Sequence, residues 1–376
     1  DETLDSFFDS VRDGFETTYP RVRYDRRSGR WFVTATNLGF PNRYLLAVSD
    51  AGVLTNGSPW TLHFWMNART GEGQPTHACA AEYPTLGIDE DALYVGATQF
   101  CGATDATASY DSSSAYVVKK AALLASGSLE VVTFDELSLG GGPGLYAPQG
   151  VDNFDENTDA GYFIGVDNAV PGRLQIRRVT DPGGTPVMSG DLTLDVAATA
   201  VPIPVPHPGG LSGLDALDDR LQQAVIRNGR LWTNHHIRVD GTGAGSGTGD
   251  RNGIRWYEIE NLTTTPALRQ DGTLFDDALT NPASYLAGSV MVSGQGHMAL
   301  GATVAGATTF VNGVAAGRFA ADPLGTLNGP AEVYSPNTAF TYNVDAPPEP
   351  QPWVAYSSTG LDPADDMTLW TLQQYV

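Results

Sequence analysis

Short apolar runs alternate with polar turns along the whole chain, and one pattern recurs. An extended segment, a polar turn and a strong aromatic or aliphatic strand come first, and two further strands follow. Four short strands per unit, repeated at this spacing, are typical of the blades of a β-propeller. The strong second strands begin 62 to 71 residues apart, at Trp31, Leu93, Tyr162, Leu231, Met298 and Leu369.

This repeat predicts an all-β, six-bladed β-propeller. The sixth unit has only two strands, so we expect an N-terminal strand around TLDSFF to close the last blade and to hide the sheet edges. A two-domain β-sandwich is the alternative, but it does not explain six similar hairpins. The predicted single domain has blades at roughly residues 19-65, 83-137, 147-196, 221-270, 285-335 and 353-376 plus 1-10.

The charge of the chain limits the classes of partner that the protein is expected to bind. The formal net charge is −22, and only Lys119 and Lys120 are lysines. So acidic a surface repels nucleic acid and anionic membranes, and an anionic polymer could bind only through a local arginine patch. No apolar run approaches the ~18–20 residues of a membrane span. We expect a monomer without nucleic-acid or membrane partners.

The two cysteines bear on the compartment. Cys79 and Cys101 lie 22 residues apart, which fits neither a zinc knuckle nor a redox CxxC pair. Their polar surroundings favour a disulfide, which is typical of secreted, extracellular or periplasmic proteins, over two buried thiols. The first residues do not form a signal peptide, so we expect any such peptide to have been removed.

Function is expected at the end of the blades that carries the long loops, because long loops on a rigid scaffold often bear sites. The second strands turn polar at this end. Blade four supplies His235 and His236, where other blades supply amides, hydroxyls and one carboxylate, Asp167, and these three residues are candidate catalytic residues. Candidate substrate-binding residues are Asn37, Gln99, Asn168, Gln374, Arg21, Gln149 and Trp353.

Neighbouring strand residues point to opposite sides, so His235 and His236 cannot easily bind one metal together. Either residue can be a hydrogen-bonded histidine between blades, and one of them can be a general base. Asp218 and Asp219 precede the first strand of blade four, and such carboxylates suit glycoside acid–base chemistry. They could equally hold a cation or pair with arginine.

The residues Asp155, Asn157 and Asp159 alternate as oxygen ligands do in calcium loops, and Gly161 follows. The glycine and the final glutamate of an EF-hand are out of place, and an Asx-rich turn needs the same residues. Ca2+ is therefore one interpretation of this segment, and no cofactor is expected to be required.

The segments PRVRYDRRSGRWFVTATN, NRYLLAVSD, PQGVDN, GYFIGVDN and DDMTLWTLQQY resemble a poorly characterised group of exported bacterial β-propeller proteins. The resemblance covers nearly the whole chain, implies the fold and export, and is sialidase-like in architecture only. We expect an exported propeller that acts on an extracellular polysaccharide, as a hydrolase or a lyase. The alternative is a non-catalytic propeller that binds carbohydrate or protein.

Overall fold

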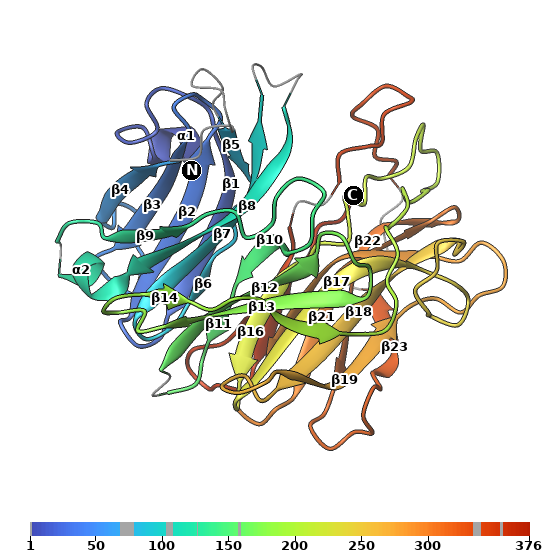
Figure 1. Cartoon of the computed structure of the whole chain (residues 1–376). Helices are drawn as coiled ribbons and strands as arrows, with labels where there is room; N and C mark the ends of the chain where they lie inside the picture. The colour runs from blue at the N-terminus through green and yellow to red at the C-terminus, as the bar shows by residue number, and fades with distance from the viewer. Residues whose placement is uncertain are drawn as a thin grey trace. The chain divides into compact units, whose positions relative to one another are not determined.

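The computed structural model describes residues 2–67, 79–102, 108–125, 127–156, 159–333, 340–353 and 356–376. It divides into two compact units. The first comprises residues 1–170 and 175–192, and the second comprises residues 171–174 and 193–376. Each unit is built from antiparallel sheets (Figure 1).

The first unit holds two blades and most of a third, of which the start of β13 and the end of β15 are assigned to the second unit. The first is β1 (Thr17–Asp25), β2 (Arg30–Asn37), β3 (Arg43–Ser49) and β4 (Trp60–Met66). The second is β5 (Cys79–Glu82) with β6 (Gly87–Ile88), then β7 (Ala92–Cys101), β8 (Ser109–Lys119) and β9 (Val131–Phe134). The third is β10 (Leu145–Gly150), β12 (Ala160–Asp167), β13 (Arg173–Thr180), β14 (Val187–Met188) and β15 (Leu192–Asp195). The short elements α2 (Lys120–Leu124) and β11 (Asp152–Asn153) lie between these strands in the sequence.

The second unit holds two blades and one hairpin. One blade is β16 (Gln223–Arg227), β17 (Arg230–Val239), β18 (Arg251–Glu260) and β19 (Ala267–Leu274). The other is β20 (Ser284–Val292), β21 (Met298–Gly306), β22 (Thr309–Arg318) and β23 (Asn328–Val333). The hairpin is β24 (Ser358–Leu361) with β25 (Leu369–Leu372).

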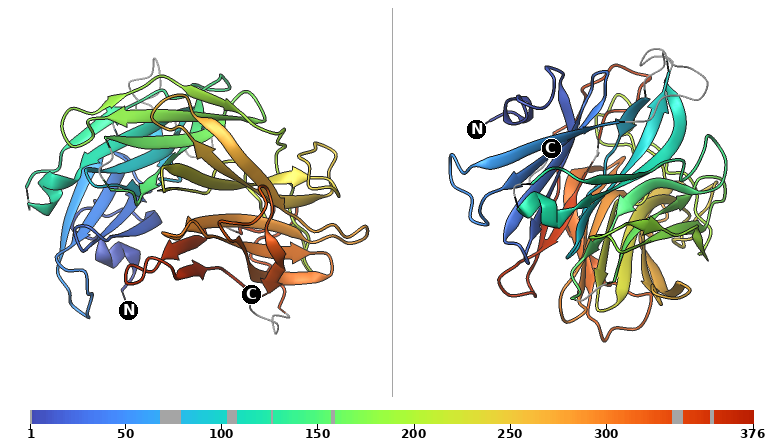
Figure 2. Two further views of the ribbon diagram at one scale, coloured as in Figure 1. Left: turned by 90° about the horizontal axis from the view of Figure 1, so that it is seen from below. Right: turned by 60° about the vertical axis from the view of Figure 1, so that its left-hand side comes forward.

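The all-β propeller class is confirmed, but the prediction of six blades is wrong: the structure has five. In the part of the chain that the structure describes, the sixth repeat is the two-stranded hairpin β24–β25, which pairs with no further strand. The segment TLDSFF instead forms the helix α1 (Leu4–Phe7), in which Thr3 Oγ1 caps the helix by accepting a hydrogen bond from the Ser6 N–H (3.1 Å). Figure 2 shows this short coil beside the blue strands of the first blade. Phe8 and Val11 pack there against Ala35, Leu45 and Ala47.

All six predicted second strands are present, and a glycine in one of them, Gly96, lies very close to the neighbouring blade. A Cβ added to Gly96 of β7 would lie 2.0 Å from the carbonyl oxygen of Pro148 in β10. A side chain at this position would therefore push the second and third blades apart. Behind it, large buried side chains such as Tyr94, Phe163 and Leu145 fill the space between those two blades.

Candidate acidic segment clamped by two histidines

His235 lies inside β17 with none of its surface exposed. Its Nδ1 lies 2.6 Å from the carbonyl oxygen of Asp219, and its Nε2 lies 2.9 Å from the Tyr257 hydroxyl. Because a carbonyl only accepts, Nδ1 carries the proton, and Nε2 accepts from Tyr257. Both ring nitrogens are therefore satisfied in the neutral ring.

His236 points to the other side of the strand and is 1% exposed. Its Nε2 donates to the carbonyl oxygen of Ala216, and its Nδ1 accepts from the backbone N–H of Ala287 at 3.3 Å. The two imidazoles therefore have no hydrogen-bond partner in common, as expected for neighbouring strand residues whose side chains point to opposite sides.

Burial lowers the pKa of both histidines, because a charged imidazole would lose its hydration. The pKa of His235 falls from 6.5 to about 3, with burial as the largest cause and nearby Arg255 adding to it. For His236 the direction is the same and burial again dominates. Both rings stay neutral near pH 7. Each one anchors the backbone of residues 215–220, which we call the acidic segment.

The acidic segment carries the two carboxyls singled out in the sequence. Asp218 is ion-paired with Arg220, whose Nε and Nη2 both lie 2.7 Å from its oxygens. Asp219 is different: burial, followed by the nearby Asp218 charge, raises its pKa. The Thr199 hydroxyl donates to its Oδ2 at 3.5 Å, a long hydrogen bond. Two adjacent carboxyls thus sit in contrasting environments.

A further anchor fixes the start of the acidic segment. The backbone N–H of Asp215 donates to the carbonyl oxygen of Gln351 at 2.8 Å, and the Gln351 side chain is completely buried. Gln351 Nε2 also donates to the Ser212 hydroxyl at 2.7 Å. The loop is therefore held by hydrogen bonds at Asp215, Ala216 and Asp219.

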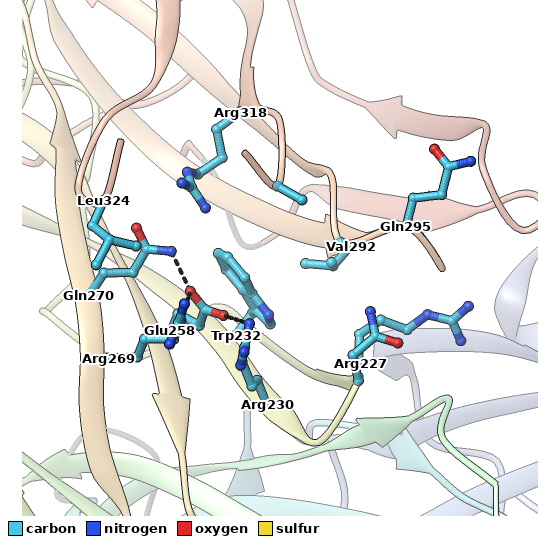
Figure 3. A pocket seen from close by; sticks show the side chains of 13 residues that line it. Arg227, Arg230, Trp232, Glu258, Arg269, Gln270, Val292, Gln295, Arg318 and Leu324 are labelled. Carbon is cyan, nitrogen blue, oxygen red and sulfur yellow. Dashed lines mark hydrogen bonds and ion pairs between the residues drawn. The ribbon is translucent and has the colours of Figure 1, made fainter. Parts of the chain in front are cut away.

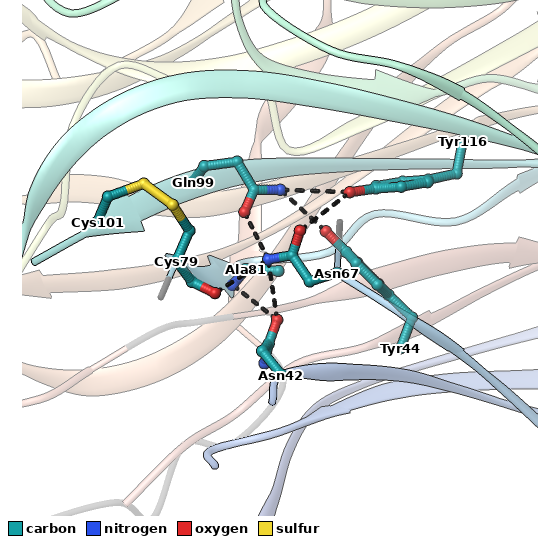
Figure 4. The surroundings of a disulfide bond; sticks show 8 residues. All are labelled: Asn42, Tyr44, Asn67, Cys79, Ala81, Gln99, Cys101 and Tyr116. Carbon is teal, nitrogen blue, oxygen red and sulfur yellow. Dashed lines mark hydrogen bonds between the residues drawn. A yellow bond between two sulfur atoms is a disulfide. The ribbon is translucent and has the colours of Figure 1, made fainter. Parts of the chain in front are cut away.

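Gln99 and the cysteines lie together in the first unit. Cys79 and Cys101 form the predicted disulfide, with Cα atoms 4.1 Å apart. The bond joins directly paired residues of β5 and β7. Gln99 beside it is fully buried, and its amide bonds to Tyr44 Oη (3.1 Å) and Asn67 Nδ2 (2.8 Å) (Figure 4). This network occupies the Gln99 amide.

Four more candidate site residues of the first unit form hydrogen bonds with residues near them. Asn37 Nδ2 donates to the carbonyl of Arg12, and Asn168 Nδ2 donates to that of Gly140. Asp167 accepts from Gln175 Nε2 at 2.6 Å. Arg21 donates to the carbonyl of Pro84 and covers the Tyr83 ring.

The remaining predicted binding residues differ in exposure. Gln149 is 3% exposed, and its Nε2 has no hydrogen-bond partner among the described residues. Trp353 is buried in an apolar cluster, with Nε1 3.5 Å from the Thr303 hydroxyl. Gln374 is exposed. Only Gln374 therefore presents its side chain openly to solvent, and roles in binding for all of these residues stay predictions.

The calcium site at residues 155–159 stays a prediction. Asn157 lies outside the described residues, Asp155 is half-buried and Asp159 is exposed. A cavity of about 620 Å³ in the first unit is lined by Glu90, Asp91, Asp159, Asp181 and Lys120, among others. Across the described part of the chain, no three His, Cys, Asp or Glu side chains are grouped so that they could hold a metal ion. None of the described helices is long and apolar enough to cross a membrane.

Sequence reasoning missed a second feature of the second unit, a pocket of about 120 Å³ that we call the arginine pocket. The β16–β17 and β20–β21 turns contribute to its wall, together with Trp232. In Figure 3, Arg318 lies above the Trp232 ring and Arg230 below it. No local motif could reveal this pocket, because its charged residues come from separate strands: Arg227, Arg230, Glu258, Arg269 and Arg318.

No family model and no curated protein matches the sequence. Among solved structures, a Trypanosoma rangeli sialidase mutant with trans-sialidase activity is 13% identical, with a TM-score of 0.42, over 95% of this chain and 51% of that one. A xylan β-1,4-xylosidase from Bacillus halodurans is 11% identical, with a TM-score of 0.38, over 88% of this chain and 59% of that one. An exo-β-1,3-galactanase from Clostridium thermocellum is 12% identical, with a TM-score of 0.37, over 80% of this chain and 58% of that one.

This chain therefore spans between about half and three fifths of the length of these three glycosidases. A likeness of this degree does not reach beyond the fold. Any inference about the chemistry of this chain therefore rests on its own residues.

Proposed function

We propose that this protein is an exported propeller that acts on an extracellular polysaccharide, with the Asp219 carboxyl as proton donor. One observation carries the proposal: burial and the Asp218 charge raise the pKa of Asp219, on a segment that two neutral histidines hold in place. A general acid must keep its proton near the working pH, and burial of a carboxyl is a common way to achieve this.

The surroundings of Asp219 support the assignment. Asp218 is held by Arg220, so the neighbouring carboxylate keeps its negative charge through a bidentate ion pair. Glycosidic bond cleavage uses such a pair, one carboxylic acid and one carboxylate. The disulfide supports export, because such bonds persist in oxidising compartments.

The experiment is a screen of purified protein against neutral, uronic and sulfated polysaccharides, with release of reducing ends or unsaturated products as the readout. On a polymer that is turned over, we expect Asp219→Asn to lower kcat about 100-fold or more. Asp195→Asn is the matched control, because it removes the same charge from an exposed ion pair with Arg173. Its kcat should stay within about twofold.

Hydrolysis and lyase action leave different products, so the same screen separates them. If no polymer is turned over, or if Asp219→Asn keeps full kcat, the proposed role of Asp219 is wrong.

A second candidate function is non-catalytic glycan binding. The observation that favours it is the full hydrogen bonding of both imidazoles, which leaves neither histidine able to take a substrate proton. Saturable binding of a polysaccharide without any product, equal in the wild type and in Asp219→Asn, would assign this function instead.

A further inference from the structure

The arginine pocket combines positive charge with a small volume in a chain whose net charge is strongly negative. Three of its arginines have carboxylate partners. Arg227 pairs with Asp366, Arg230 Nη1 lies 2.9 Å from Glu258 Oε1, and Arg269 lies 3.5 Å from Glu258 and 3.4 Å from Glu260. These pairs neutralise part of the pocket.

Arg318 is the exception. Arg318 is 4% exposed, and no ion pair joins it to a carboxylate among the residues whose side chains the structure describes. Its guanidinium donates to the carbonyl oxygens of Thr326, Asp322 and Pro323. The Asp322 carboxylate turns away, accepting from the Phe319 N–H at 2.7 Å and from Asn328. This buried guanidinium thus has carbonyl partners and an aromatic ring beside it, but no carboxylate partner among these residues.

The walls of the pocket are fixed by a second set of bonds. Glu258, which is 1% exposed, accepts from Arg230 and from Gln270 Nε2. Gln270 Oε1 in turn accepts from the Gly325 N–H at 2.8 Å. The guanidinium of Arg318 also lies over the Trp256 ring, 5.8 Å from the ring centroid. The arginines are therefore held in place before any ligand arrives.

We propose that the arginine pocket binds the oxyanion group, carboxylate or sulfate, of an acidic ligand. The guanidinium of Arg318 supplies a positive charge, and Arg230 supplies a second donor at the more open side, since 40% of its side chain is exposed. The pocket volume of about 120 Å³ corresponds to about four water molecules. It therefore admits the charged group of a ligand, while the rest of the ligand stays outside.

This site is independent of the proposed catalysis, because none of its lining residues belongs to the acidic segment. The test is isothermal titration calorimetry at constant ionic strength with sodium glucuronate and sodium sulfate as separate probes, and with glucose as the neutral control. We expect saturable binding of at least one anion and none of glucose. Binding of glucuronate alone indicates a uronic acid ligand, and binding of sulfate alone indicates a sulfate ester.

The variants decide whether the pocket is responsible. Arg318→Gln should weaken binding about tenfold or more, because it removes this positive charge. Arg173→Gln removes an arginine charge outside the pocket, and Asp219→Asn removes the proposed acid; both should bind the anion as the wild type does. If Arg318→Gln does not fold, Arg230→Gln decides, with an expected loss of about fivefold. Lack of anion binding by the wild type, or unchanged binding in both arginine variants, overturns the proposal.

Discussion

Charge of opposite sign gathers at two places along β17, and the two places are built differently. Near the middle of β17, two neutral histidines hold an acidic segment, and every ring nitrogen has a partner. Near the start of β17, arginines surround a pocket, and Arg318 has no carboxylate partner in the described structure. The residues that stand out most in the sequence are therefore structural supports, while the unbalanced charge lies at residues without a motif.

Among the tests of this comparison, removal of an imidazole ring should change stability most. His235→Ala or His236→Ala leaves a cavity and unsatisfied carbonyl groups, so each should lower the free energy of unfolding by about 2–4 kcal/mol. The measurement is urea unfolding at pH 7.

The matched control is His297→Ala at the β20–β21 turn, near the arginine pocket. The His297 side chain is half-buried, and its Nδ1 accepts a hydrogen bond from the Ala320 N–H. We expect a loss below about 1 kcal/mol there. If all three variants lost the same free energy of unfolding, the two buried histidines would stabilise the fold no more than His297 does, which contradicts the comparison.

A smaller effect is expected in the pH dependence of stability. The folded chain keeps His235 neutral down to about pH 3, while the unfolded chain protonates this residue near 6.5. Between these values the unfolded state binds the extra proton, so the free energy of unfolding falls as pH falls, by about 1.4 kcal/mol per pH unit from this residue. Asp219, whose pKa is raised on folding, acts in the opposite direction.

The measurement compares wild type with His235→Gln in urea unfolding between about pH 7 and pH 4. The stability difference between the two proteins should shrink as the pH falls, because only the wild type loses the histidine contribution. Parallel curves would mean that His235 titrates alike in both states and is not held neutral in the fold.

Much of the architecture could be predicted from periodicity. All six second strands and the Cys79–Cys101 disulfide are confirmed, since each depends on local pattern or composition. The closure of a sixth blade was wrong, because TLDSFF has a helix cap at Thr3 and apolar residues that pack on the first blade.

The candidate site was predictable only in part. The same polar residues can end a strand at the surface or inside the protein. The sequence therefore singled out His235 and His236, but it could not show that both side chains are buried. The arginine pocket was out of reach for another reason. Its ion pairs join residues such as Arg227 and Asp366, which lie 139 positions apart.

The most direct test of the account is the pH profile of kcat/KM on a polysaccharide that the wild type cleaves, measured for the wild type, His235→Gln and Asp219→Asn. A general acid is active while protonated, so wild-type activity should fall as the pH rises through the raised pKa of Asp219. The account predicts that His235→Gln keeps this alkaline fall and that the low remaining activity of Asp219→Asn lacks it. A fall that is lost in His235→Gln and kept in Asp219→Asn would identify the imidazole as the titrating group and contradict the account.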